Sequence, residues 1–211
     1  MGSGGKTTFL RWLSQRLSGK IILTTSTHIR PFADLPLVAV SPGKREEALR
    51  ALREAFSTGR VVCLGMPVQE GKLADPSSVL SFAELLCEAD HVLVEADGAA
   101  GKPLKAHRDF EPVIPQETEL TVGLVGASGL GKPAAEVCHC PGLFCAICGS
   151  AEDEPVRAEH IAAVVNRENL ADCYLVNQAD AADAVQVRRL CGQIAREAFP
   201  CSLGRWLTSG A

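Results

Sequence analysis

The sequence predicts an α/β fold, a three-layer αβα domain with a mostly parallel sheet. Short, continuous apolar runs alternate with longer segments in which apolar residues recur at helical spacing. This alternation is typical of parallel strands whose two faces are covered by helices. Glycine-rich, polar or acidic residues follow several of the runs. Ligands of such sheets bind at those strand ends, so we expect the functional residues there.

Length and composition predict one compact domain spanning residues 1–211. With 46% hydrophobic and 22% charged residues, the chain has ordinary globular usage and enough apolar side chains for a substantial core. Its net charge of −4 argues against a nucleic-acid or anionic-membrane partner. No apolar run reaches transmembrane length, and the N-terminus lacks the apolar core of a signal peptide. We therefore expect a cytoplasmic protein with no nucleic-acid or membrane partner.

The first predicted element is a phosphate-binding loop that opens a helix. Its residues are Gly2, Ser3, Gly4, Gly5, Lys6, Thr7 and Thr8. Glycines let backbone N–H groups turn toward phosphate oxygens, and Lys6 supplies a positive charge for the β- and γ-phosphates. The Thr7 hydroxyl is placed to ligate Mg²⁺ at the start of the helix. The loop therefore predicts a P-loop NTPase-like domain that binds Mg²⁺ with GTP or ATP.

The strand that normally feeds such a loop does not precede it. The first glycine of the pattern G-x-x-x-x-G-K-[ST] would fall one residue before Met1. In βα phosphate sites that strand lies inside the sheet, so omitting it would leave backbone groups of its neighbours unpaired. We therefore expect a fold that lacks its first strand, in a chain truncated at its N-terminus.

A second glycine-rich loop satisfies G-x-x-x-x-G-K at residues 126–132. Pro133 follows its lysine, where the full pattern requires serine or threonine. Proline offers neither a hydroxyl for Mg²⁺ nor an N–H group for phosphate. We interpret this segment as a tight turn after a strand, with a phosphate contact as the less favoured alternative.

The remaining elements follow from hydrophobic periodicity. The predicted strands are residues 20–25, 37–40, 61–64, 91–94, 120–125 and 173–176. The predicted helices are residues 9–17, 48–56, 76–87 and 187–198. Asp75 and Pro76 are expected to open the third helix, as its N-cap and its first helical residue.

Two carboxylates follow the predicted strand 91–94. Glu95 and Asp97 resemble a Walker B segment, because Mg²⁺ prefers hard oxygen ligands and keeps several waters. We expect Asp97 to hold the ion together with Thr7, and Glu95 to orient a water molecule or a substrate group. With Lys6, these two carboxylates form the predicted catalytic set. The alternative is a solvated acidic loop.

Asn177 and Asp180 follow the predicted strand 173–176 and resemble the N-K-x-D loop of GTP-binding proteins. In that loop the asparagine braces the structure and contacts the base, and the aspartate accepts from guanine N1 and N2 donors. Adenine offers no matching donor pair. Gln178 stands where the lysine would be. We expect Asn177 and Asp180 to bind the nucleotide and to favour GTP, with ATP binding and no base recognition as open alternatives.

Two further loops carry candidate substrate contacts. Thr25 and Thr27 follow the first predicted strand, where hydroxyls of switch-like loops ligate Mg²⁺ or contact a γ-phosphate. Lys102 and Lys105 follow the acidic strand end and are placed to meet an anionic substrate or a phosphate. Lysines on a surface loop more often only increase solubility, which is the alternative for this pair.

The cysteine count is nine, an odd number without an export signal, which predicts free thiols. Those in apolar patterns, expected to be core residues, are Cys63, Cys87, Cys173 and Cys191. A separate cluster around His139 comprises Cys138, Cys140, Cys145 and Cys148. It lacks the paired C-x-x-C spacing of zinc ribbons. Packing on a short helix with Pro141 near its start is therefore favoured over metal or selenium chemistry.

Several motifs together resemble one family. They are GGKTT at residues 4–8, TTSTH at 24–28, GKL at 71–73, VEADG at 94–98, PLKA at 103–106, EPVIP at 111–115 and LVNQAD at 175–180. On these motifs the chain resembles the YqeC family over nearly its whole length, most specifically at residues 95–115. Members are described as accessory proteins of selenium-dependent molybdenum hydroxylases. The resemblance implies a nucleotide-dependent role in maturing or inserting a selenium-modified molybdenum cofactor, with a molybdenum hydroxylase or a cofactor-maturation protein as partner.

The chain departs from the family pattern in two places. The strand before the loop is missing, which affects the expected nucleotide affinity. Cys140 also stands where the family carries an arginine after the histidine at position 139. The extra thiols are therefore expected to be peculiar to this lineage rather than part of a shared site.

Three functions fit the sequence. The leading one is an accessory NTPase that prefers GTP, in which Lys6, Thr7 and Asp97 assemble the Mg²⁺-nucleotide and either binding or hydrolysis drives a conformational change. A small-molecule kinase would use the same loop with Asp97 or Glu95 as base, but no arginine-rich lid is evident. The third is a selenium or metal carrier that works through the cysteine cluster without NTPase activity.

Overall fold

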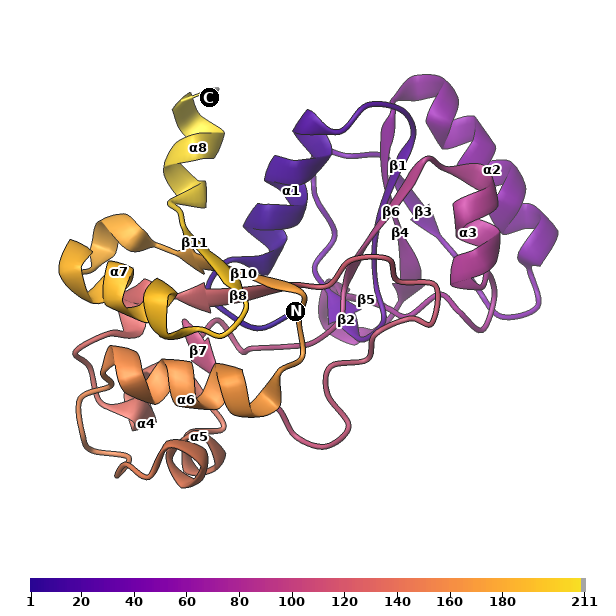
Figure 1. Cartoon of the computed structure of the whole chain (residues 1–211). Helices are drawn as coiled ribbons and strands as arrows, with labels where there is room; N and C mark the ends of the chain where they lie inside the picture. Colours follow the sequence, from indigo (N-terminus) through magenta and orange to yellow (C-terminus); the bar gives the residue numbers. More distant parts are fainter. Residues whose placement is uncertain (210–211) are drawn as a thin grey trace. The chain divides into compact units, whose positions relative to one another are not determined.

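The computed structural model describes residues 1–209, which pack as two compact units built from discontinuous segments. Unit 1 contains residues 1–9, 98–112 and 119–209, and unit 2 contains residues 10–97 and 113–118. Each unit has its own sheet (Figure 1). A single domain over residues 1–211 stays a prediction, because a compact unit need not fold independently.

Unit 2 is built on a mostly parallel six-stranded sheet. Its strands are β1 (Ile21–Thr25), β2 (His28–Ile29), β3 (Leu37–Ala39), β4 (Val61–Pro67), β5 (Leu73–Ala74) and β6 (His91–Glu95). The order is β2-β5-β4-β1-β6, with β3 also pairing β4. The pairs that join β1, β3, β4 and β6 are parallel, whereas β5 pairs β2 and β4 antiparallel. The four longer strands match the sequence predictions, and the two-residue strands β2 and β5 were too short to predict.

Helices cover both faces of the unit 2 sheet (Figure 1). These helices are α2 (Arg45–Thr58), α3 (Phe82–Glu88) and the part of α1 (Lys6–Arg16) from residue 10 onward, since the first turn of α1 belongs to unit 1. A short 3₁₀ turn, η1 (Gln69–Gly71), precedes β5. Ile22 packs in one cluster with Leu52 of α2 and Leu85 of α3. Its neighbours in β1, Ile21 and Leu23, instead share a cluster with residues of α1 and the following loops. Successive strand side chains point to opposite faces, so the predicted three-layer α/β class is confirmed.

The third helix begins later than predicted. Asp75 does not cap a helix, because its Oδ1 accepts a hydrogen bond from the N–H of Ser77 at 2.8 Å and closes a turn. The helix α3 starts at Phe82 with Ser81 as its N-cap. The Ser81 Oγ accepts from the N–H of Glu84, and a Glu84 carboxylate oxygen accepts from the N–H of Ser81 at 2.9 Å. This capping box satisfies two helix-end donors, which a start at Pro76 would not do.

Unit 1 contains a three-stranded parallel sheet and a two-stranded parallel ribbon. The sheet has the order β11-β10-β8, from β8 (Val122–Gly126), β10 (Cys173–Asn177) and β11 (Glu197–Pro200). The ribbon joins β7 (Leu104–Lys105) to β9 (Cys138–His139). Residues 1–3 run parallel along the other edge of β8, where Leu124 N–H donates to the Met1 carbonyl and Ser3 N–H donates to the Leu124 carbonyl. The glycine-rich loop therefore leaves directly from this sheet.

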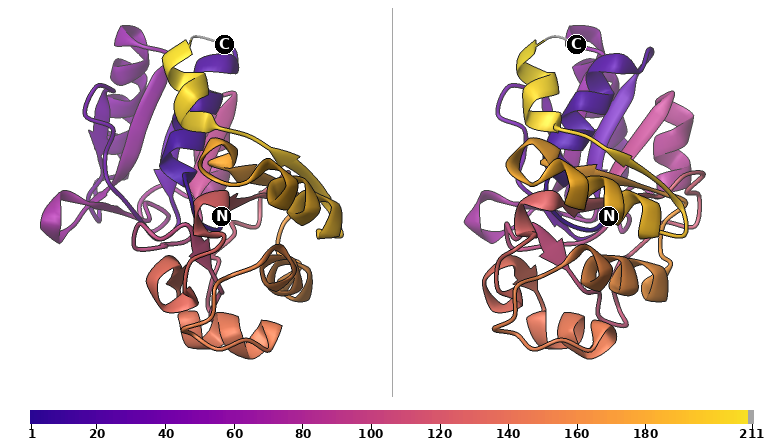
Figure 2. Two further views of the ribbon diagram at one scale, coloured as in Figure 1. Left: turned by 90° about the vertical axis from the view of Figure 1, so that its left-hand side faces the viewer. Right: turned by 60° about the vertical axis from the view of Figure 1, so that its left-hand side comes forward.

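The helices of unit 1 are α4 (Ala134–Val137), α5 (Pro141–Cys148), α6 (Ala158–Glu168), α7 (Ala184–Gln193) and α8 (Leu203–Ser209). Two 3₁₀ turns, η2 (Ala127–Gly129) and η3 (Ala179–Ala181), follow β8 and β10. In the two views of Figure 2, α6 and α7 lie side by side, as they do in Figure 1. The segment after β8 is a turn followed by a four-residue helix, as expected of a loop that does not match the full phosphate pattern.

In unit 1 one predicted helix is shorter than expected at its carboxyl end, and one helix was not predicted. The helix predicted over residues 187–198 ends at Gln193, and Ala198 lies in β11, where it pairs with Tyr174 of β10. That strand covers what would otherwise be an open edge of β10. The helix α6 was not predicted, although Ile161, Val164 and Val165 follow helical spacing along its buried face.

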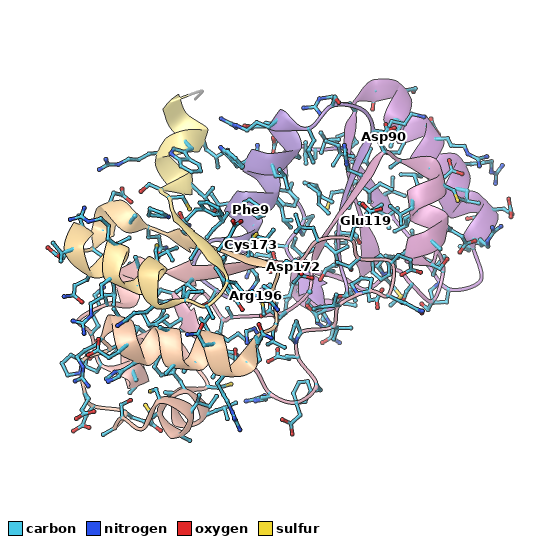
Figure 3. The ribbon with its side chains drawn as sticks, in the orientation of Figure 1. Phe9, Asp90, Glu119, Asp172, Cys173 and Arg196 are labelled. Atoms are coloured by element: carbon cyan, nitrogen blue, oxygen red, sulfur yellow. The ribbon has the colours of Figure 1, made fainter. Side chains whose placement is uncertain are left out.

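The amino ends of the unit 1 strands are tied by side chains that Figure 3 labels. Asp172, directly before β10, accepts a hydrogen bond on its Oδ2 from the N–H of Thr121 at 2.7 Å, which fixes the register with β8. Arg196 donates from Nε to the Oδ1 of Asn169 at 3.0 Å. These contacts lie at the amino ends of the strands, and the loops described next lie at the carboxyl ends. Across the described part of the chain, every helix is too short or too polar to cross a bilayer.

Candidate functional site

The loop before α1 has a backbone that only glycine adopts readily. Gly2, Gly4 and Gly5 have φ values of 90°, 83° and 126°. A Cβ atom on Gly4 would lie 2.5 Å from the Gly126 Cα, and one on Gly5 would lie 2.4 Å from the Asn177 Nδ2. The loop is therefore pressed against the carboxyl ends of β8 and β10. This is the position in which ligands of parallel sheets bind.

Lys6 turns its side chain back over this loop. Its Nζ donates a hydrogen bond to the Gly2 carbonyl at 2.6 Å, and the residue is only 8% exposed. Lys6 and Thr7 form the first turn of α1. The backbone N–H groups of a first helical turn have no partner inside the helix and carry partial positive charge. An ammonium group and these amides are thus held at one place in unit 1.

Asn177 joins the loop to the C-terminal part of unit 1. Its Nδ2 donates to the Gly4 carbonyl at 2.7 Å, and its Oδ1 accepts from the Leu203 N–H at 2.9 Å. The Cys201 thiol approaches the same Oδ1 at 3.7 Å. Asn177 is only 3% exposed. The geometry supports the bracing role expected of this asparagine, while its predicted contact with a base stays a prediction.

Asp180 lies in η3 with its side chain partly exposed. Its N–H donates to the Ser202 Oγ at 3.2 Å, and its Oδ2 lies 2.8 Å from the Arg205 Nε. The pKa of the Asp180 carboxyl is lowered, mainly by the hydrogen bond from Ser202 and less by Arg205. The carboxylate is therefore held in its ionised, accepting form. Gln178, in the position of the missing lysine, accepts a hydrogen bond from the Ser128 hydroxyl at 2.6 Å.

Lys105 is buried rather than solvent-exposed. Its side chain is 1% exposed, with Nζ 2.5 Å from the Gly98 carbonyl and 3.0 Å from a Glu111 carboxylate oxygen. The alternative that this lysine only increases solubility is wrong. Lys105 instead ties together the two ends of the loop 98–111. Lys102, which is less buried, donates to the Glu136 carbonyl.

The ribbon β7–β9 brings a histidine beside these cations. Lys105 and His139 are paired directly across the ribbon. The pKa of the His139 imidazole is lowered, first by burial and then by Lys105, with smaller effects of Arg108 and Lys6 in the same direction. The imidazole is therefore favoured in its neutral form. The ribbon is also tied to the glycine-rich loop, because the Ser3 Oγ donates to the Pro103 carbonyl at 2.8 Å.

In unit 2, the acidic strand end is buried. Glu95 is 9% exposed and Asp97 is fully buried, so the alternative of a solvated acidic loop is wrong. Thr25 pairs with Glu95 across β1 and β6, and its Oγ1 donates to the Glu95 carbonyl at 2.8 Å. The Thr27 N–H donates to the Thr25 Oγ1 at 2.9 Å. The structure thus brings Thr25, Thr27 and Glu95 together at the carboxyl ends of two parallel strands.

The predicted site residues are distributed over both units. Unit 1 holds Gly2, Ser3, Gly4, Gly5, Lys6, Thr7, Thr8, Lys102, Lys105, Asn177 and Asp180, and unit 2 holds Thr25, Thr27, Glu95 and Asp97. Within unit 1 the structure gathers the glycine-rich loop, Asn177 and Asp180 at one end of the sheet. A Mg²⁺ site shared by Thr7 and Asp97 stays a prediction.

All nine cysteines are free thiols, as predicted. Cys138 is 3% exposed, and burial raises the pKa of its thiol to about 12, helped by Cys145 and Cys148. The helix α5 carries these last two cysteines. Within residues 1–209, no three His, Cys, Asp or Glu side chains are grouped to hold a metal ion. Cys87 is exposed, so its expected core position is wrong.

Sequence reasoning missed several residues that support the unit 1 site. Ser128, Cys201, Ser202 and Leu203 all contact the segment 177–180. A cavity of about 20 Å³, lined in part by Met1, Gly2 and Ser3, also contains an unpredicted pair. There the His107 Nδ1 lies 2.7 Å from a Glu168 carboxylate oxygen. No local pattern marks these residues, because each contact joins segments that are far apart in the sequence.

Comparisons with known proteins identify relatives of this chain. The family model described as YqeC protein matches residues 1–142. The uncharacterized protein YqeC of Escherichia coli (strain K12) is 29% identical over 172 residues, which cover 78% of this chain and 65% of that relative. The chain thus spans slightly less than two thirds of the length of the curated relative. No solved structure matches it. Because the family model matches most of its residues, the chain belongs to the YqeC family.

Proposed function

We propose that this protein binds a Mg²⁺-nucleoside triphosphate, with a preference for GTP, and uses binding or hydrolysis as an accessory factor in maturing a molybdenum hydroxylase or its cofactor. The observation that carries the proposal is the hydrogen bond from the Asn177 Nδ2 to the Gly4 carbonyl. It links the predicted phosphate loop directly to the predicted base-reading segment. A bound nucleotide would contact the loop through its phosphates and the segment through its base, so the two must be held near each other.

The phosphate end of the proposed site is the glycine-rich loop. Lys6 holds its ammonium group 2.6 Å from the Gly2 carbonyl. A phosphate oxygen is a stronger acceptor for an ammonium than a neutral carbonyl, so a bound triphosphate would compete for this donor. The amides of the first turn of α1 would bind the same oxygens. Thr7 would hold Mg²⁺, which neutralises phosphate charge when it is bound.

The base end of the proposed site is Asp180. Its ionised carboxylate is an acceptor only, which suits the N1–H and N2–H donors of guanine and not the acceptor N1 of adenine. Asn177 keeps this segment at a fixed distance from the loop. These features support GTP over ATP.

The biological role rests on family membership. Glu95 and Asp97 would complete the catalytic set, and Thr25, Thr27, Lys102 and Lys105 are the proposed substrate contacts. A carrier function of the cysteine cluster is disfavoured, because a thiol with a pKa of about 12 at Cys138 stays protonated and does not ligate metals well.

Isothermal titration of the protein with GTP and ATP in the presence of Mg²⁺ tests the proposal. Lys6→Ala should weaken nucleotide binding by about tenfold to a hundredfold, since a charge-assisted hydrogen bond is lost. The second glycine-rich loop supplies a matched control. Lys132→Ala removes a lysine that also follows a glycine, and it should leave the affinity unchanged.

Two results would contradict the proposal. Equal affinities of the Lys6→Ala variant and the parent protein would remove the phosphate assignment. A loss of binding in Lys132→Ala but not in Lys6→Ala would move the site to the second loop. Circular dichroism of both variants establishes that any loss is not a loss of fold.

A further inference from the structure

The turn that follows β11 contacts the base-reading segment of unit 1. The Ser202 Oγ accepts a hydrogen bond from the Asp180 N–H at 3.2 Å, and the Arg205 Nε lies 2.8 Å from the Asp180 Oδ2. The chain is fixed just before and just after Ser202, because the Cys201 N–H donates to the Val176 carbonyl at 2.9 Å and the Leu203 N–H donates to the Asn177 Oδ1 at 2.9 Å. Asp180 therefore contacts Ser202 of this turn and Arg205 of the helix α8 that follows it.

The guanidinium group of Arg205, which contacts Asp180, resembles the hydrogen-bonding edge of a guanine base. A guanidinium group presents N–H donors on nitrogens that share one carbon, and the N1–C2–N2 edge of guanine presents the same arrangement. Adenine has no such pair. Arg205 contacts one carboxylate oxygen of Asp180. A bound guanine would need the same oxygen as an acceptor, so the guanidinium and the base would compete for it.

We infer that Ser202 and Arg205 are specificity-determining residues of the base site: Ser202 positions the Asp180 carboxylate, and Arg205 occupies it until a guanine base replaces the guanidinium. This inference rests on the proposed GTP binding and adds the residues that regulate it. The hydrogen bond from Ser202 is also the main cause of the lowered pKa of Asp180, ahead of Arg205.

Arg205 should compete only weakly with guanine for the Asp180 carboxylate, so that a bound base can displace it. The Arg205 side chain is 73% exposed and the Asp180 side chain 32% exposed. Exposed ion pairs of this kind change equilibria only slightly, so removing the guanidinium should tighten GTP binding by about twofold to fivefold. ATP should not benefit, because its base makes no use of the released carboxylate.

Titrations of GTP and ATP with Mg²⁺ test the inference on the full chain. Arg205→Ala should bind GTP about twofold to fivefold more tightly, with the ATP affinity unchanged. Arg196→Ala is the matched control, because Arg196 is bonded to Asn169 at the opposite end of the same sheet, and it should behave as the parent protein. Ser202→Ala should weaken GTP binding about threefold to tenfold, since the hydroxyl that accepts from the Asp180 N–H and holds this residue in place is lost, and Ser202→Thr should restore it.

The double variant Asp180→Ala with Arg205→Ala identifies the route of the effect. In the Asp180→Ala background, Arg205→Ala should no longer tighten GTP binding. An unchanged or weakened GTP affinity in Arg205→Ala overturns the inference while leaving GTP binding in place, and so does an equal gain for ATP. If the parent protein binds neither nucleotide, the proposed function itself fails. Arg205 is exposed, so this variant is expected to fold even if Ser202→Ala does not.

Discussion

A single buried amide organises the candidate site at the residue scale. Asn177 uses its nitrogen for the glycine-rich loop and its oxygen for the turn after β11. Removing a buried amide that satisfies two segments costs more than the bonds themselves, because their partners are left unsatisfied. The position of the glycine-rich loop in unit 1 therefore depends on a residue that is remote in the sequence.

The cysteines give a residue-scale prediction of reactivity. Cys138 is buried and has a thiol pKa of about 12, so at pH 8 only about one molecule in ten thousand carries the reactive thiolate. Cys87 is exposed. Iodoacetamide at pH 8, followed by peptide mass spectrometry, should modify Cys87 quickly and leave Cys138 unmodified.

In guanidinium chloride both thiols should react at similar rates, because unfolding removes the burial that raises the pKa of Cys138. A raised pKa protects the thiol at every pH below it, so the protection should persist at pH 10. Rapid modification of Cys138 in the folded protein would show that the thiol is neither buried nor protonated, and would reopen the carrier function.

Local sequence patterns predicted individual residues unevenly. The position of Lys6 and Thr7 at the start of α1 was predictable, because the pattern that positions them is contained in one loop and one helical turn. Ser202 and Arg205 were not, since they reach Asp180 only after β11 has returned the chain to the sheet. The burial of Lys105 was missed for the same reason, because its partner Glu111 lies beyond a loop of irregular structure.

At the scale of elements, helix ends were the hardest feature to predict. The capping box of Ser81 and Glu84 decided where α3 begins, and it prevailed over the Asp-Pro signal at residues 75–76. The strand β11 replaced the end of a predicted helix because β10 has a free edge that a strand can satisfy. Hydrophobic periodicity indicates which residues are buried, but it does not indicate which strand edges need a hydrogen-bonding partner.

The capping box of α3 gives an element-scale prediction. Ser81→Ala removes the side chain that accepts from the Glu84 N–H, and it should lower the free energy of unfolding by about 1 kcal/mol. Ser77→Ala is the control, because Ser77 bonds through its backbone N–H in the preceding turn, and it should change stability by less than about 0.5 kcal/mol. Urea unfolding followed by circular dichroism measures both.

The pH dependence of this difference follows from Glu84. Hydrogen bonds from Ser81 and Arg45 lower the pKa of Glu84 from 4.5 to about 2, with the Ser81 backbone as the largest cause. The group therefore stabilises the fold above pH 4.5, and this contribution is lost as the pH falls toward 2. The difference between Ser81→Ala and the parent protein should shrink over that range. A difference that grows toward acid pH would contradict the capping box.

At the scale of the whole molecule, the class of fold could be predicted from the sequence, whereas the division of the chain into two compact units could not. Alternating strands and helices predicted parallel sheets with helices on both faces, as found in unit 2. The division into two units was not predicted, because each unit takes segments from distant parts of the chain. The glycine-rich loop, Lys105 and the segment 177–180 all belong to unit 1 for this reason.

The family comparison supports only part of the proposed site. The family model covers residues 1–142, which include the glycine-rich loop and the acidic strand end. The proposed base-reading segment at residues 177–180 and the turn after β11 lie outside that match. The proposed preference for guanine therefore rests on the chemistry of Asn177 and Asp180 in this structure.

The central claim is that backbone amides of the glycine-rich loop hold the phosphates of a nucleotide. Protein labelled with ¹³C-carbonyl serine and ¹⁵N-glycine has only four serine-to-glycine amides, those of Gly4, Gly19, Gly129 and Gly210, and Gly129 lies in the second loop. On adding Mg²⁺-GDP, the NMR signal of Gly4 should shift strongly while those of Gly19 and Gly129 stay in place. A shift of Gly129 without one of Gly4, or no shift at any of these amides, would contradict the claim.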